Sequence, residues 1–123
     1  MNTKDYTGIR HGGPLPAPKD ISIPDDMADM LDDYYESSTS QLEELEAAVL
    51  ECESGQQVEE NEAAIRRILH KLKGEAGMMG IMDIEQLCHQ VEFAVDELDP
   101  KEKYDMLLRV NDWFVCALNE MGL

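Results

Sequence analysis

Apolar positions recur every three or four residues through most of the chain, which is the period of an amphipathic α-helix. The pattern begins at Pro24, where a proline followed by two aspartates is typical of a helix start. It continues to about Ser54, and Gly55 ends it. A run of serine and threonine over 37–40 interrupts this first segment, and it either breaks the helix or caps its continuation.

Three further segments show the same helical period. The first runs from about 59 to 80. The second runs from Asp83, which we expect to cap it, to 98. The third begins at about 101, after a break at Asp99-Pro100. No run of alternating apolar and polar residues indicates a β-strand. The predicted fold class is all-α: an antiparallel four-helix bundle, with room for a short extra N-terminal helix.

Residues 1–23 lack this periodicity. They contain glycines and prolines at Gly8, Gly12, Gly13, Pro14, Pro16 and Pro18. This composition predicts a flexible or extended N-terminal arm over 1–23, followed by a single helical domain over 24–123. Neither a signal peptide nor an apolar run of membrane-spanning length is present in the sequence, so we expect a soluble, cytoplasmic protein that does not enter a membrane.

The charge balance is strongly acidic, with 10 basic and 27 acidic residues and a formal net charge of −17. Nucleic acid and anionic membranes are therefore poor candidates as partners. Four basic residues nevertheless lie within eight positions of one another around His70: Arg66, Arg67, Lys71 and Lys73. They either create a local positive field that suits a phosphate or pair with nearby acids. The three cysteines are widely spaced, which predicts free thiols in a reducing compartment and no zinc site.

The sequence around His70 combines an exposed histidine with small and basic neighbours. Residues 70–80 read His-Lys-Leu-Lys-Gly-Glu-Ala-Gly-Met-Met-Gly, and His70 lies off the apolar stripe of its helix. Its surface neighbours at −4, +3, +4 and +7 are Arg66, Lys73, Gly74 and Gly77. A glycine inside a helix costs about 1 kcal/mol relative to alanine. The pair of glycines indicates that a partner approaches the backbone here, or alternatively that two helices pack closely, with Gly77 nearer to the boundary.

The string from His70 to Gly80 resembles the signature of histidine phosphotransfer (HPt) domains. Its continuation to His89-x-x-Glu92 is most similar to the amino-terminal phosphotransfer domain of chemotaxis histidine kinases. The resemblance covers residues 70–92, and the helical layout agrees with the family's bundle. It implies a phosphoryl carrier that exchanges phosphate with an aspartate on a receiver domain.

The resemblance also implies a role for each matching residue. His70 is the expected phosphoacceptor, and Glu92 is expected to hydrogen-bond its other ring nitrogen. Lys73 faces the phosphate, and His89 extends the hydrogen-bond network. Gly74 leaves room for the incoming receiver. From the residues alone, Glu92 and His89 could instead pair with each other or with basic side chains of the preceding helix.

Further expectations concern partners. We assign Arg66 and Gly77, together with Gly74, to the surface that meets the partner. Glu75 places an acid inside the motif, which would weaken the attraction for phosphate or help to select partners. The expected partners are a response regulator receiver domain and a sensor histidine kinase. We expect a monomer that binds no cofactor or metal, with Mg²⁺ supplied by the receiver.

Two other classes of function are built on similar helical bundles. A bundle that binds or sequesters a receiver or kinase without carrying phosphate is the alternative to a phosphocarrier. A carboxylate-bridged metal bundle requires Glu-x-x-His pairs. The residues three positions before His70 and His89 are Arg67 and Gln86, so this pattern is absent. The sequence contains no glycine-rich nucleotide loop, and we therefore expect a relay carrier and not a kinase.

Overall fold

The computed structural model describes residues 15, 17, 21 and 23–120. These residues form helices and no strand, which confirms the predicted all-α class. A short 3-10 helix precedes the bundle, as the sequence allowed. The elements are η3 (Asp25–Met30), α1 (Leu31–Glu53), α2 (Val58–Met79), α3 (Met82–Val95) and α4 (Pro100–Glu120).

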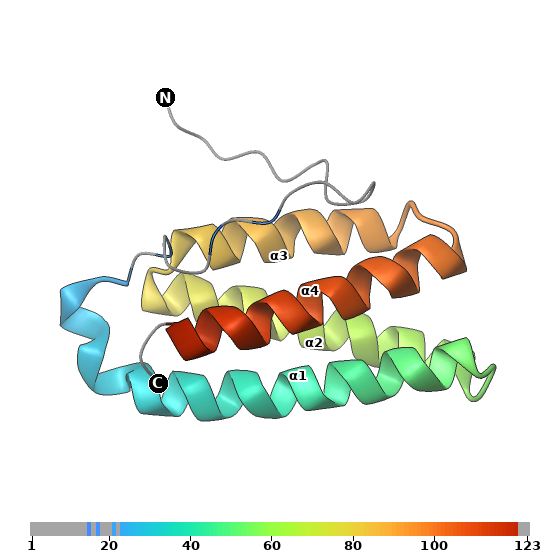
Figure 1. Ribbon diagram of the computed structural model, residues 1–123, viewed down its shortest axis with the longest axis horizontal. Helices are drawn as coiled ribbons and strands as arrows, with labels where there is room; N and C mark the ends of the chain where they lie inside the picture. The colour runs from blue at the N-terminus through green and yellow to red at the C-terminus, as the bar shows by residue number, and fades with distance from the viewer. Residues whose placement is uncertain (1–14, 16, 18–20, 22, 121–123) are drawn as a thin grey trace.

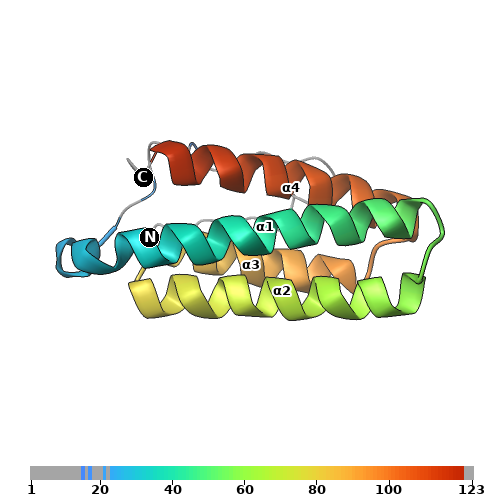
Figure 2. The ribbon, with the colours of Figure 1, turned by 90° about the horizontal axis from the view of Figure 1, so that it is seen from below.

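The four α-helices run antiparallel to their neighbours in sequence, and η3 extends the bundle beyond the start of α1 (Figure 1). Figure 2, turned by 90°, shows the same antiparallel arrangement of the four helices. α1 packs against both α2 and α4, and α2 packs against α3, whereas contact between α3 and α4 is sparse. The turn between α2 and α3 is made by Gly80, whose φ of +73° is a left-handed conformation that glycine adopts without a steric penalty. This tight turn fixes α2 and α3 side by side.

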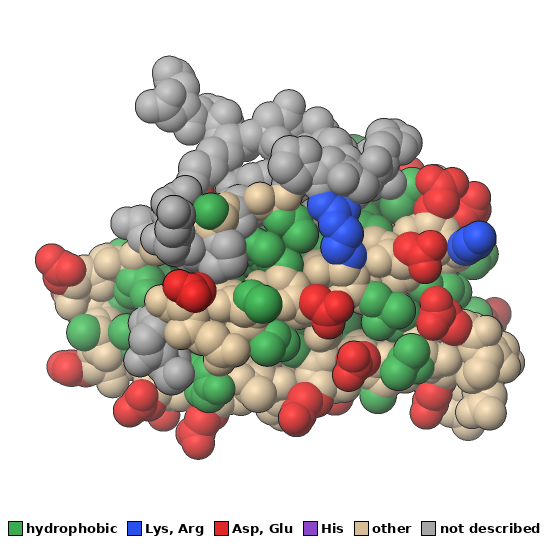
Figure 3. Space-filling model, in the orientation of Figure 1, with side chains coloured by type: hydrophobic (Ala, Val, Ile, Leu, Met, Phe, Trp, Pro, Cys, Tyr) green, Lys and Arg blue, Asp and Glu red, His purple; other side chains and the backbone are tan. Residues whose placement is uncertain are grey.

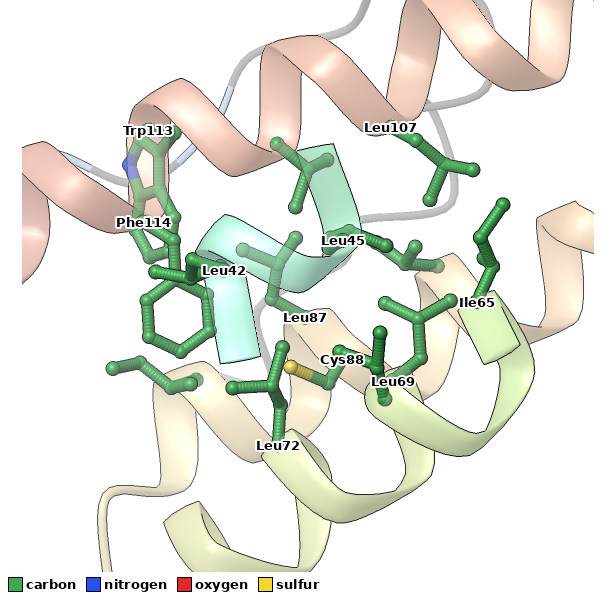
Figure 4. Packing of buried hydrophobic residues seen from close by; sticks show 14 of the residues in the cluster. Leu42, Leu45, Ile65, Leu69, Leu72, Leu87, Cys88, Leu107, Trp113 and Phe114 are labelled. Carbon is green, nitrogen blue, oxygen red and sulfur yellow. The ribbon is translucent and has the colours of Figure 1, made fainter. Parts of the chain in front are cut away.

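The apolar stripes of the sequence form the core of the bundle. Figure 4 shows side chains from all four helices meeting there, among them Leu42, Leu69, Leu87 and Phe114. Burial of this kind contributes roughly 25 cal/mol per Å² of apolar surface. Met30, the last residue of η3, lies outside the core and is 50% exposed.

Two predicted helix boundaries are wrong. The serine and threonine run over 37–40 neither breaks nor caps a helix, because α1 is continuous through it. Ser38 and Gln41 are buried within the bundle, and Gln41 Nε2 donates to Ser37 Oγ at 3.0 Å. Ser37 Oγ and Gln41 Nε2 also donate to the Glu75 carboxylate of α2, so these two donors have partners within the helical structure. Asp83 lies in the first turn of α3, and the residue before the helix is Ile81.

Polar contacts connect the helices at the end of the bundle away from η3. Glu62 Oε2 on α2 accepts hydrogen bonds from Tyr104 Oη at 2.7 Å and from Lys103 Nζ at 2.9 Å. The tyrosine hydroxyl and the lysine hold the pKa of Glu62 below its usual value. Nearer the middle, Asn111 Nδ2 on α4 donates to the Leu42 carbonyl oxygen of α1 at 2.7 Å. These bonds connect α4 to both α2 and α1.

The chain before η3 contacts the bundle where it is described. Leu15, Ile21 and Ile23 are half-buried against the core. Ala17 is exposed, and the other residues of the predicted flexible arm lie outside the described ones. In the described part of the chain, no helix is long and apolar enough to cross a membrane. The three cysteines are free, with Cys52 and Cys88 buried.

Candidate functional site

His70 lies on the outer surface of α2. Its neighbours Leu69 and Leu72 belong to the core, so the helical period directs the position between them to solvent. The imidazole is 76% exposed. The side chain is therefore accessible to a large partner, as the sequence predicts.

A carboxylate from α3 lies beside this imidazole. Glu92 Oε2 is 3.5 Å from His70 Nδ1, and its other oxygen, Oε1, is 2.6 Å from Lys73 Nζ. The first distance is longer than a usual hydrogen bond, and the second is a close ion pair. Glu92 and Lys73 are both half-buried. The structure thus brings together the three residues expected at the centre of the site, with Glu92 between the other two.

The contact between His70 and Glu92 belongs to a longer seam between α2 and α3. Four residues back on α2, Arg66 Nε and Nη2 each lie 3.1 Å from Asp96 Oδ1. Asp96 directly follows α3 and is four positions after Glu92 in the sequence. The two pairs are therefore one helical turn apart on both helices, as expected for antiparallel neighbours. Arg66 was predicted to face a partner, but its guanidinium is paired within the chain. Asp96 was not predicted, although the register set by His70 and Glu92 is enough to place it opposite Arg66.

The basic residues around His70 are largely paired with acids. Arg67 Nη2 lies 3.4 Å from Glu44 Oε2 of α1, in addition to the pairs made by Arg66 and Lys73. Lys71 is exposed. Because three of the four positive charges have carboxylate partners, the local field at His70 is weaker than the sequence cluster suggests. The carboxylate beside the imidazole, Glu92, is also the partner of Lys73, so the charge of this lysine is partly compensated.

The two glycines of the motif have different surroundings. A Cβ built on Gly74 would meet no atom within 4 Å, so this position opens to solvent. A Cβ on Gly77 would lie 2.7 Å from Glu85 Oε2 of α3. Gly77 therefore serves close packing of α2 against α3, the alternative left open by the sequence. Only Gly74 presents bare backbone on the exposed face beside His70.

Replacing Gly74 by alanine should raise the free energy of unfolding by about 1 kcal/mol, because glycine disfavours the helix and the new methyl group meets nothing. Chemical denaturation of the two proteins measures the difference. Gly77→Ala is the matched control, and its gain should be smaller because the Glu85 carboxylate must move. A Gly74→Ala protein less stable than the wild type would contradict the open surroundings of this position.

Glu75 does not face the phosphate site, contrary to the sequence-based expectation that it would weaken the attraction for phosphate. Its carboxylate points to α1, where Ser37 Oγ donates to Oε2 at 2.8 Å and Gln41 Nε2 donates to Oε1 at 2.9 Å. Five residues separate Glu75 from His70, which places the two on different faces of α2. The acid in the motif therefore connects α2 to α1.

His89 is exposed on the outer side of α3. Within the described residues it forms no hydrogen bond or ion pair with His70, Lys73 or Glu92, so the expected extension of the network is not seen. Its neighbour Cys88 is fully buried, and burial raises the pKa of that thiol to about 12. Cys88 is therefore a protonated core residue. In the described part of the chain no three His, Cys, Asp or Glu side chains are grouped to hold a metal ion.

The chain is similar to proteins of a known family. The Hpt domain family model matches residues 29–113. The chain is similar to the chemotaxis protein CheA of Halobacterium salinarum, with 42% identity over 72 residues, which are 55% of this chain and 11% of that protein. It is also similar to the chemotaxis protein CheA of Rhizobium meliloti, with 31% identity over 71 residues, 58% of this chain and 9% of that protein. No solved structure matches.

The family match extends from η3 into α4 and includes the whole seam between α2 and α3. The chain spans only about a tenth of the length of these two relatives. Hpt domains are histidine phosphotransfer modules of two-component signalling, and they are phosphocarriers and not kinase catalytic domains. From the family match and the helical fold together, the chain belongs to the Hpt domain family.

Proposed function

We propose that His70 carries a phosphoryl group between a donor and the aspartate of a response regulator receiver domain. The donor is a sensor histidine kinase or a phosphorylated receiver. The observation that supports this most is the exposed imidazole with a carboxylate at Nδ1 and a lysine on the same carboxylate. An ordinary surface histidine needs neither neighbour.

The chemistry follows from the position of Glu92. A carboxylate beside Nδ1 favours the tautomer with the proton on Nδ1, which leaves the lone pair on Nε2, across the ring. Nε2 attacks the phosphorus of an aspartyl phosphate, so a P–N bond forms as the P–O bond breaks, and the aspartate leaves as a carboxylate. The imidazole becomes positively charged in this step, and Glu92 stabilises that charge. Transfer to a receiver is the reverse reaction.

Lys73 is the residue that faces the incoming phosphoryl group. Its ammonium is held by Glu92 on the His70 side of the seam, where it can compensate the negative charge of the arriving phosphoryl oxygens. The exposed backbone at Gly74 lets the receiver approach closely. We expect Mg²⁺ to be bound by the receiver's own acidic residues, since phosphoryl transfer needs charge neutralisation that one lysine does not supply.

The test is phosphorylation of the purified protein by a radiolabelled phosphorylated receiver or by a kinase. We expect a label that is stable to alkali and labile to acid, located by peptide mapping to the peptide that contains His70. Added to an unphosphorylated receiver with Mg²⁺, the labelled protein should lose its label, and EDTA should block that loss without removing the label from the protein. Receiver binding with no label from any donor would instead support a non-phosphorylated adaptor.

A further inference from the structure

A methionine-lined pocket lies on the other side of α2 from the seam with α3, where η3, α1 and α2 meet. Its volume is about 340 Å³, and its lining includes Met27, Met30, Met78, Met79, Asp33 and Glu75. This volume is at the low end of the range of about 300–1,000 Å³ for small-molecule sites. It suits one or two inserted side chains better than a cofactor.

The rim of the pocket is adaptable and apolar. Met78 is 77% exposed and Met30 is 50% exposed, whereas Met79 is buried at the base. Unbranched thioether side chains can repack around different partners, which is why methionine is common on surfaces that bind peptides. Both of these exposed methionines line the same cavity, so they place apolar surface around its opening.

The surroundings of the pocket are acidic. Asp33 and Glu75 line it, and η3 and the first turn of α1 add Asp25, Asp26, Asp29 and Asp32. The sequence has no lysine, arginine or histidine between Asp20 and Ile65. On the face drawn in Figure 3, acidic side chains lie along the whole length of the bundle, the η3 end included, and the Lys and Arg side chains lie away from that end.

The carboxylate of Glu75 adds a charge inside the pocket. It is held by neutral donors, Ser37 and Gln41, and within the described residues no cation pairs with it. A carboxylate can accept about four hydrogen bonds, so capacity remains for a charged donor from outside. An apolar cavity with an acidic wall and rim is complementary to a segment that carries apolar and basic residues together.

We propose that this pocket docks a basic amphipathic segment of a partner protein. An apolar side chain of the segment enters between Met30 and Met78, and its lysine or arginine side chains pair with Asp33 and Glu75. This is the helix-in-groove type of recognition, read by apolar anchors and flanking charge. Because Glu75 faces α1 while Glu92 and Lys73 face each other across the α2–α3 seam, the segment can bind whether or not His70 carries a phosphoryl group.

The test uses the full chain with ¹³C-labelled methionine methyl groups and a synthetic helical peptide of leucine and lysine. We expect the methyl resonances of Met27, Met30, Met78 and Met79 to shift on titration. The methyl groups of Met82, exposed on α3, and Met106, buried in α4, should not move. A peptide of the same pattern with glutamate in place of lysine should not bind. Equal shifts at Met82 would mean diffuse electrostatic attraction and would overturn the proposal.

A pair of double variants separates the pocket from general surface hydrophobicity. Met30→Gln with Met78→Gln should weaken binding of the leucine–lysine peptide by about tenfold or more, as loss of a central anchor does. Leu50→Gln with Val115→Gln removes two apolar side chains that are also exposed, 49% and 43%, and it should change the affinity for this peptide less than about twofold. Equal loss in both, or no loss in either, rejects the assignment. Methyl shifts that follow protein concentration without peptide would assign the pocket to a second copy of the chain.

Discussion

A His70→Gln protein is expected to accept no measurable phosphoryl group from any donor that labels the wild type. Glutamine has nearly the length of histidine but no ring nitrogen with a nucleophilic lone pair, so the P–N bond cannot form. Stability should change by less than about 0.5 kcal/mol, because an exposed side chain away from the core contributes little to it. The measurement is label incorporation at equal protein concentration, with chemical denaturation to confirm that both proteins are folded.

The matched control for this prediction is His89→Gln, which removes the other described histidine, exposed on the neighbouring helix. It should retain the label, since within the described residues His89 makes no hydrogen bond or ion pair with His70 or Glu92. Label that persists in His70→Gln and disappears in His89→Gln would transfer the phosphoacceptor role to His89. Label lost in both would indicate that His89 takes part in the site through a contact formed only with the partner.

Helical periodicity could predict most of the fold because burial in a bundle repeats with the helix itself. Leu69, Leu72 and Leu87 are core residues for that reason, and His70 is exposed for the same reason. The continuity of α1 through 37–40 could not be predicted in this way. It depends on Glu75 of α2, which accepts hydrogen bonds from Ser37 and Gln41, and a contact between distant segments leaves no local pattern.

The candidate site could be predicted in part. The motif brings His70 and Lys73 together by helical spacing, but the position of Glu92 depends on the register of α3 against α2. Once the His70–Glu92 pair is known, the antiparallel register predicts the others. Moving back along α2 from His70 to Arg66 corresponds to moving forward from Glu92 to Asp96, and moving forward to Gly77 corresponds to moving back to Glu85. The pairing of the basic residues with acids was harder to predict from the sequence. Arg67, for example, pairs with Glu44 of α1, and the register of α2 against α3 says nothing about that contact.

Replacing Glu92 by glutamine should slow phosphoryl transfer by about 100-fold, because a residue that orients and stabilises an imidazolium contributes an effect of this order or more. Glutamine keeps the shape but loses the charge that stabilises the phosphorylated ring and holds Lys73. Glu92 acts through His70, so it is a positioning residue. Its signature is the tautomer: ¹⁵N spectra of the wild type should show the His70 proton on Nδ1, and the variant a mixture of both forms. Receiver affinity should be unchanged.

Glu85→Gln is the matched control, since it makes the same change of charge on the same helix, two turns nearer its start and facing Gly77. If transfer slows only through the general reduction of negative charge, both variants will be affected alike, and the tautomer of His70 will not differ between them. If Glu92 fixes the imidazole, only its variant will show the slow transfer together with the mixed tautomer. A Glu92→Gln protein with normal transfer and a mixed tautomer would contradict the prediction, because transfer would then not depend on how Glu92 fixes the imidazole.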